Sequence, residues 1–163
     1  MPVVGVGVDI VQAARIGRLL QRQSPLRFAR RMLAPREVEM LMAAFEQHAE
    51  SLHQPLALGR AAGSALPARP AAARGDAERL MESAAPWERR LVDYLGTRWA
   101  IKEAAFKAMY PRMHLDWHQV VVAKSAGKPF LEIAGADGVR GHVSVSHDAG
   151  LVVAMVVLEE LRE

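Results

Sequence analysis

The sequence of 163 residues contains no cysteine. This absence excludes disulfide bridges and thiolate metal sites, and it is compatible with a reducing compartment. The sequence also has no run of about 18 apolar residues, the length that a membrane-spanning helix needs. The first residues, PVVGVGVDIV, lack a basic stretch followed by an apolar one, so we expect neither a secretory signal nor a mitochondrial presequence. We therefore expect a cytoplasmic protein without a membrane partner, with a mitochondrial location as the alternative.

Acidic residues are missing from one part of the chain. None occurs between Gln12 and Arg36, whereas this segment contains Arg15, Arg18, Arg22, Arg27, Arg30, Arg31 and Arg36. A basic patch attracts nucleic acid, anionic lipid or an acidic protein; the alternative is a solvated helix face. Aromatic residues make up 6% of the sequence and are not interleaved with the arginines, which argues against a surface that stacks nucleic-acid bases. We expect no nucleic-acid partner.

What is present is a globular composition, with 51% apolar and 24% charged residues. A chain of this length can bury a core of its own, so we expect a single domain over residues 1–163. The segment from about residue 49 to 86 differs, because it is rich in Ala, Pro, Gly and Arg and has no apolar period. We interpret it as a low-complexity insertion, a mobile surface loop to which we assign no chemistry.

The apolar pattern predicts a strand at the start of the chain. Apolar side chains there alternate with two glycines and an aspartate. One predicted face carries Val4, Val6, Val8 and Ile10, and the other carries Gly5, Gly7 and Asp9. Glycines on a strand face permit the close approach of a ligand or of another backbone. Asp9 therefore either caps the next helix or binds a cation or a hydrogen-bond donor. The GVGVDI stretch lacks the third glycine of a dinucleotide fingerprint.

Helices follow this strand. Apolar residues recur at helical spacing from about residue 13, over 26–33, from 35 to 48 and over 87–110. Gly96 marks a potential break or bend in the last of these helices. In the first one the outer face carries Arg15, Arg18 and Arg22.

Two pairs of strands are predicted after the helices, over residues 117–133 and 141–161. The segment Leu151–Leu158 is apolar on both faces, as a central strand is. A strand, several helices and then a set of antiparallel strands indicate the α+β class.

The stretch RWAIKEAAFKAM, from Arg98 to Met109, is the most informative one. Glu103 and Lys107 are spaced i, i+4, and as a surface pair they would contribute a few tenths of a kcal/mol. Most positions around them are apolar, and charges on a largely buried helix are costly unless they are paired or used. A carboxylate with a lysine suits Mg²⁺ bridging to phosphate oxygens, with the ammonium neutralising the remaining phosphate charge.

Three histidines are further candidates for catalysis or metal binding. His147 shares a strand face with Val143 and Val145, and by itself such a residue is more often a hydrogen-bonded core or edge histidine than a catalyst. His114 and His118 are four residues apart but flank a predicted strand start. They lack the helical context of a paired-histidine zinc site.

Four segments together resemble the holo-acyl-carrier-protein synthase type of 4′-phosphopantetheinyl transferase. In chain order they are VGVDIV, RWAIKEAAFKAM, GKP and VSVSHDAGLVVAMVVLE. The similarity spans about residues 3–45 and 91–159. It implies the 4′-phosphopantetheinyl transferase fold and an assembly that is usually a homotrimer, with active sites at subunit interfaces.

The resemblance implies transfer of the phosphopantetheine arm of coenzyme A to a serine of an apo acyl carrier protein, with release of adenosine 3′,5′-bisphosphate. Asp9 and Glu103 match the ligands of Mg²⁺, which also binds the pyrophosphate of coenzyme A. Lys107 matches a lysine near that pyrophosphate. These three residues form the expected catalytic set.

The resemblance also implies residues that bind the two substrates. The family's residues on the nucleotide side of coenzyme A match Arg98, Ser146 and His147 of this sequence. The loop that lines the cleft in the family matches the segment with Lys128 and Pro129. The helix that receives the acidic recognition helix of the carrier protein matches Arg15, Arg18 and Arg22.

The sequence departs from the family pattern at one place and leaves alternatives for the base and for the function. The chain reads MYPRM where relatives commonly have glycines, so Tyr110 or Arg112 could replace main-chain contacts to the pyrophosphate. The proton of the serine could pass to a metal-bound water or to Glu103. Two alternative functions are another Mg²⁺-dependent phosphate or pyrophosphate enzyme and a non-catalytic basic binding module. The sequence does not identify the carrier protein.

Overall fold

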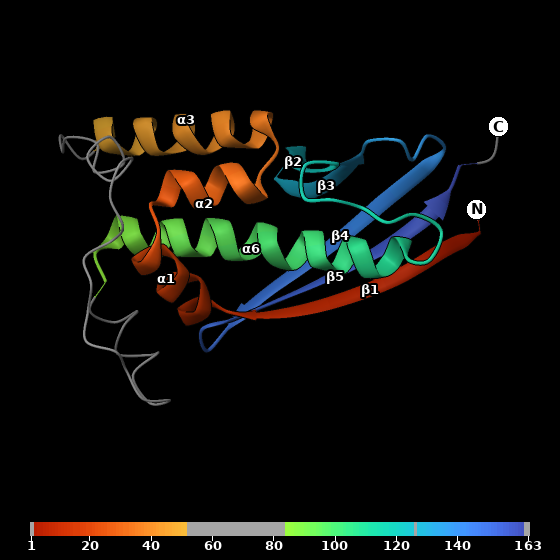
Figure 1. Ribbon diagram of the computed structural model, residues 1–163, viewed down its shortest axis with the longest axis horizontal. Coiled ribbons are helices and arrows are strands. Elements are labelled where there is room, and N and C mark those ends of the chain that lie inside the picture. Colours follow the sequence, from red (N-terminus) through yellow and green to blue (C-terminus); the bar gives the residue numbers. More distant parts are fainter. Residues whose placement is uncertain (1, 52–83, 126, 162–163) are drawn as a thin grey trace.

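The structure is a computed structural model that describes residues 2–51, 84–125 and 127–161. Its elements follow the predicted order of strand, helices and strands (Figure 1). They are β1 (Val3–Gln12), α1 (Ala13–Arg22), α2 (Pro25–Met32), α3 (Pro35–Ser51), α6 (Pro86–Met109), β2 (Val120–Ser125), β3 (Lys128–Ile133), β4 (Val139–Asp148) and β5 (Leu151–Glu160). The predicted α+β class is confirmed. The predicted insertion at 49–86 lies largely outside the described residues.

The five strands form one antiparallel sheet in the order β1-β5-β4-β3-β2. The first strand of the chain therefore pairs with the last, and β5 is central between β1 and β4, as the apolar pattern of Leu151–Leu158 predicts. The long helix α6 crosses one face of the sheet, and α1, α2 and α3 pack beside it towards one end (Figure 1). Within the described ranges, no helix is long and apolar enough to cross a membrane.

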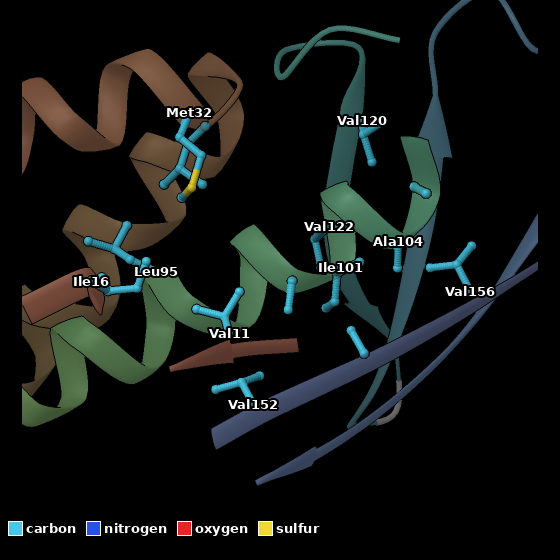
Figure 2. Close-up of a cluster of buried hydrophobic side chains, with 14 of the residues drawn as sticks. Val11, Ile16, Met32, Leu95, Ile101, Ala104, Val120, Val122, Val152 and Val156 are labelled. Atoms are coloured by element: carbon cyan, nitrogen blue, oxygen red, sulfur yellow. The ribbon is translucent and has the colours of Figure 1, made fainter. Parts of the chain in front are cut away.

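The core lies between α6 and the sheet. Figure 2 shows its side chains converging from α1, α2, α6 and the strands, among them Ile16, Met32, Leu95, Ile101, Ala104, Val122, Val152 and Val156. Burying such apolar surface is the main contribution to the stability of a fold of this size. The core thus fixes the position of α6, the helix that carries most of the predicted catalytic residues.

Helix α6 continues without interruption through Gly96, so the predicted potential break at this glycine is wrong. A methyl group there would lie 3.6 Å from Ile16 Cγ1, which is ordinary contact distance. At the start of the helix, Pro86 occupies the first turn and the Glu88 carboxylate accepts the Ala85 N–H at 2.8 Å.

The glycine face of β1 lies directly against the backbone of α6. A Cβ atom on Gly5 would lie 2.0 Å from the Ala108 carbonyl oxygen, and one on Gly7 would lie 1.9 Å from that of Ala104. Both distances exclude any side chain, so the helix packs against bare strand backbone. The prediction that these glycines permit close approach is confirmed, and the approaching group is a helix.

The opposite face of β1 and β5 is open. Its side chains are 56% (Val6), 49% (Val8), 58% (Ile10), 36% (Val153) and 43% (Met155) exposed. Val4 does not share this face, because a register shift between Val3 and Gly5 turns it, half-buried, towards the core. The predicted alternation therefore holds from Gly5 onwards.

Candidate active site

Asp9 and Lys107 meet where β1 crosses α6. The Lys107 ammonium donates to an Asp9 carboxylate oxygen at 2.8 Å and to the Val8 carbonyl at 2.8 Å. The Asp9 side chain is 16% exposed and that of Lys107 is 52% exposed. Asp9 does not cap the next helix, because the N-cap of α1 is Gln12. The structure therefore favours the second role predicted for Asp9, the binding of a donor or a cation.

Glu103 lies one turn before Lys107 on α6 and is half-buried. Burial raises the pKa of its carboxyl group above the usual 4.5, and the negative charge of Asp9 raises it further. The positive charges of Lys107 and Arg15 oppose this effect. The structure thus brings together Asp9, Glu103 and Lys107, the three residues predicted to be catalytic.

The arrangement fits a divalent cation. Two repelling carboxylates, one of them with a raised pKa, would both be stabilised in their charged form by a shared cation. Mg²⁺ typically takes one or two protein carboxylates and completes its octahedral shell with water and substrate phosphates. In the described part of the chain, no group of three or more His, Cys, Asp or Glu side chains could hold a metal ion. A cation at Asp9 and Glu103 would therefore depend on water and substrate for its other ligands.

The contact between β1 and α6 sets the spacing of this site. Gly7 touches the Ala104 backbone, and Ala104 is the neighbour of Glu103. Because β1 then continues past the helix, Asp9, two residues further on the same face, comes within reach of Lys107. Two glycines and two small helix residues thus hold the charged groups in place.

A cavity of about 190 Å³ lies beside the site, between α1, α2 and α6. Its lining consists of Leu19, Gln23, Phe28, Arg31, Met32, Trp99 and Trp117. The ring of Trp99 lies 5.9 Å from that of Phe28 and 4.7 Å from that of Trp117, and the Arg15 guanidinium lies 5.4 Å from the Trp99 ring. Sequence reasoning missed this aromatic cavity, although Trp99 precedes Glu103 by four residues and so shares its side of α6.

Arg15, Arg18 and Arg22 are exposed along the outer side of α1, as predicted. Arg15 links this basic row to the site, because it faces Trp99 and its charge acts on Glu103.

The predicted coenzyme A residue Arg98 turns inward. Its side chain is 6% exposed, its Nε lies 3.7 Å from the Glu37 carboxylate, and its guanidinium lies 3.5 Å from the centre of the Tyr94 ring. Burial lowers the pKa of Arg98, while Tyr94 and Glu37 act in the opposite direction. In this arrangement Arg98 serves the core, so the geometry does not support the predicted nucleotide contact.

Ser146 and His147 lie on opposite faces of the sheet. Ser146 pairs with Val153, which in turn pairs with Ile10, so its side chain is on the open face and not on the side of Asp9. His147 lies on the α6 side, where its Nε2 is 3.3 Å from the Thr97 hydroxyl oxygen.

Lys128 and Pro129 begin β3, which is separated from β1 by β4 and β5. A single chain therefore does not gather all the residues that the resemblance implies for coenzyme A binding. The three residues predicted to be catalytic lie together, and the others are spread over the sheet.

The remaining candidates have other contacts. The ring of His114 lies edge-on to Tyr110, with centroids 5.2 Å apart, and His118 Nε2 lies 3.1 Å from the Arg30 carbonyl oxygen. Tyr110 is 64% exposed directly after α6, and Arg112 lies 4.0 Å from Glu160. No contact of Tyr110 or Arg112 with the catalytic three is present among the described residues.

Comparison with known proteins places this chain in a family. Residues 69–156 match the family model of the 4′-phosphopantetheinyl transferase superfamily. The holo-[acyl-carrier-protein] synthase of Desulfovibrio desulfuricans is 32% identical over 170 residues, which cover 98% of this chain and 99% of the relative. That of Geobacillus kaustophilus is 32% identical over 162 residues, with 98% and 91% coverage.

The fold agrees with these sequence matches. A crystal structure of a holo-(acyl-carrier-protein) synthase from Bacillus anthracis in complex with CoA (3′,5′-ADP) has a TM-score of 0.57 at 22% identity, and the match covers 97% of both chains. The resemblance seen in the four sequence segments is confirmed. This chain belongs to the 4′-phosphopantetheinyl transferase superfamily.

Proposed function

We propose that this protein transfers the 4′-phosphopantetheine group of coenzyme A to a serine of an apo acyl carrier protein and releases adenosine 3′,5′-bisphosphate. The observation that carries the proposal is the hydrogen bond between Lys107 and Asp9 at the β1–α6 crossing, with Glu103 near enough for both charges to act on its carboxyl group. It occurs in a chain that matches holo-[acyl-carrier-protein] synthases over nearly its whole length.

The three residues would neutralise phosphate charge and would form no covalent bond with the substrate. In phosphoryl transfer, the serine oxygen forms a bond to phosphorus as the bond to the departing phosphate breaks, and catalysis depends on positioning and electrostatic stabilisation. Asp9 and Glu103 would hold Mg²⁺, which when bound neutralises pyrophosphate charge. Lys107, which donates to Asp9 in this structure, would donate to oxygens of the departing phosphate. Glu103 is our candidate for accepting the serine proton, because it lies in the site beside Asp9 and Lys107.

The carrier protein would dock on the basic row of α1. Arg15, Arg18 and Arg22 are exposed there, and acidic residues are missing from the sequence around them. An acidic surface would be attracted by this charge, and Arg15 would guide it towards the catalytic residues.

We also propose that the protein is a homotrimer whose copies meet at the open face of β1 and β5. Exposed apolar side chains gather on this face, and large patches of this kind mark interaction sites. Ser146 lies on the same face, opposite to Asp9, so a coenzyme A site that contains both residues needs a second copy. We retain the cytoplasm as the expected compartment; the relatives named above are bacterial, which favours it over mitochondria.

The test is the intact mass of an apo acyl carrier protein incubated with coenzyme A, Mg²⁺ and this protein. We expect a gain of one phosphopantetheine group, and no gain with Asp9→Ala, with Glu103→Ala or in the presence of EDTA. Arg98→Lys is a matched comparison on the same helix. Because Arg98 is buried, we expect this substitution to lower the Tm and to leave the KM for coenzyme A nearly unchanged.

The product separates this proposal from its alternatives. Hydrolysis of coenzyme A without a change in carrier mass would indicate a different Mg²⁺-dependent pyrophosphate enzyme. A folded protein that binds acidic partners but neither binds nor cleaves coenzyme A would indicate a basic binding module.

A further inference from the structure

Lys102 stands next to Glu103 in the sequence but projects into the interior. Its side chain is fully buried, and so is its partner, the carboxylate of Glu37. Each residue of an α-helix is rotated by about 100° from the one before, so Lys102 points nearly opposite to Ala104, the residue that touches Gly7. Helix α6 is thus held from two sides, by strand backbone on one and by an ion pair on the other.

All three donors of the Lys102 ammonium are used. It donates to the Glu37 carboxylate at 2.5 Å, to the Met32 carbonyl at 3.1 Å and to the Trp117 carbonyl at 2.6 Å. A lysine ammonium has three N–H groups, so no donor remains unpaired. The three acceptors lie on the end of α2, the first turn of α3 and the segment before β2.

The Glu37 carboxylate is equally occupied. It accepts from the Ala34 N–H at 2.9 Å, from the Val122 N–H at 3.1 Å and from Lys102. One buried pair therefore joins α2, α3, α6, β2 and the segment at Trp117. Met32 and Trp117, two of its contacts, also line the aromatic cavity beside the carrier-docking arginines.

We propose that Lys102 and Glu37 are positioning residues, which set the rotation and axial position of α6 so that Glu103 and Lys107 face Asp9. The inference rests on the proposed function for its activity measurement. A shift of about 1 Å at reacting groups can reduce a rate about 100-fold, and a residue that orients a ligand of a metal typically changes activity or metal affinity by about 10- to 100-fold.

The distinctive contribution of this pair is its set of hydrogen bonds to backbone groups of other segments. Buried ion pairs can often be replaced by apolar residues without loss of stability, because removing two charges from water is costly. An apolar pair, however, would leave the Met32, Trp117, Ala34 and Val122 backbone groups unpaired. The ion pair gives α6 one hydrogen-bonded register against four other segments.

The experiment compares Lys102→Met with Leu91→Ala in the full-length protein. Leu91 is fully buried on the same helix, and it lies 12 residues before Glu103, about 18 Å along the axis. Both variants lose core contacts, so both are expected to have a lower Tm. Two quantities are then measured at a temperature where each variant is folded: kcat for carrier modification at saturating Mg²⁺, and the affinity for Mn²⁺ without substrates, by electron paramagnetic resonance.

We expect Lys102→Met to lose about 10- to 100-fold in both kcat and Mn²⁺ affinity, while Leu91→Ala keeps both. Equal values in the two variants at equal loss of Tm would overturn the inference. If Lys102→Met does not fold, Lys102→Gln replaces it, because its shorter amide keeps two of the three donors and loses the charge. The same comparison with Leu91→Ala then applies.

Failure of the proposed function gives a different result. Wild-type protein that binds Mn²⁺ without modifying a carrier would refute the transferase reaction, and the Mn²⁺ affinities of the variants would still decide the inference. Wild-type protein that neither binds Mn²⁺ nor modifies a carrier would refute the site and the inference with it.

Discussion

At the scale of single residues, the site depends on charges that are partly removed from water. Asp9 and Glu103 are both carboxylates, and Lys107, on the same helix as Glu103, forms its ion pair with Asp9. Burial and then the charge of Asp9 raise the pKa of Glu103 above its usual range, against the opposing charges of Lys107 and Arg15. Such shifted pKa values are common in active sites, where a substrate or a cation supplies the balance of charge.

This raised pKa predicts the effect of Glu103→Gln. Because the pKa of Glu103 is higher in the folded chain than its usual 4.5, the folded state binds the proton more tightly than the unfolded state does. Its contribution to stability therefore falls as the pH rises from about 4.5 through the folded pKa, and at pH 7 the ionised carboxylate is destabilising. Without divalent metal, Glu103→Gln should raise the Tm at pH 7.

Thermal denaturation in EDTA at pH 7 and at pH 4 checks this prediction. The difference in Tm should become smaller at the lower pH, where the Glu103 carboxyl is mostly protonated in both states. With Mg²⁺ the same variant should lose carrier modification by about 100-fold or more, because metal charge stabilisation contributes several kcal/mol. Glu39→Gln, an exposed change on α3, is the control. A lower Tm for Glu103→Gln in EDTA would contradict the sign.

At the scale of elements, the decisive contact joins the glycine face of β1 to small residues of α6. Gly5 and Gly7 allow the α6 backbone to touch β1, and Ala104 and Ala108 complete the contact from the helix. This close approach brings Lys107 within hydrogen-bonding distance of Asp9. Glycine is required here for space and not for an unusual backbone angle, since neither residue has a positive φ.

Gly7→Ala should therefore both destabilise the fold and disturb the site. The added Cβ would lie 1.9 Å from the Ala104 carbonyl oxygen and 2.7 Å from the Ala108 nitrogen, both backbone atoms, so the whole helix must move. We expect the free energy of unfolding to fall by about 1–3 kcal/mol, measured by urea denaturation, with loss of activity in the folded fraction.

Gly96→Ala is the matched glycine-to-alanine change, on α6 itself but away from its contact with β1. Its Cβ would meet Ile16 at 3.6 Å and Val152 at 3.9 Å, and it lies inside a helix. We expect it to raise the free energy of unfolding by about 0.4–1 kcal/mol and to keep activity. Equal free energies of unfolding for Gly7→Ala and Gly96→Ala would contradict the close packing of α6 against the glycine face of β1.

At the scale of the whole molecule, the sheet has one covered and one open face. The helices of the described ranges lie on the same side of β1 and β5, and the far side exposes Val6, Val8, Ile10, Val153 and Met155 (Figure 1). The proposed coenzyme A residues are divided between these faces. Self-assembly through the open face would bury the apolar side chains and bring the divided residues together.

Val8→Glu tests this assembly. Val8 is 49% exposed in the single chain, so the charge should leave the fold intact, yet it would be buried without a partner in an interface between copies. We expect a trimeric mass for the wild type and a monomeric mass for the variant by light scattering, with loss of carrier modification. Glu39→Lys, on α3, should remain trimeric. A monomeric but active wild type would refute the homotrimer.

Features that depend on local spacing could be predicted from the sequence. The α+β order, the glycine and Asp9 face of β1, the side of α6 shared by Glu103 and Lys107, and the outward arginines of α1 all follow from periods of two or 3.6 residues. The motifs around these residues also carried the family resemblance.

Tertiary structure alone decided which face of each element is covered. Helix packing on the glycine face of β1 left the valines exposed, and strand register placed Ser146 on the side away from Asp9. The same packing turned Arg98 towards Glu37, 61 positions earlier in the sequence, and paired Glu37 with Lys102. Such contacts join residues far apart in the chain, and neither periodicity nor composition specifies which distant groups meet.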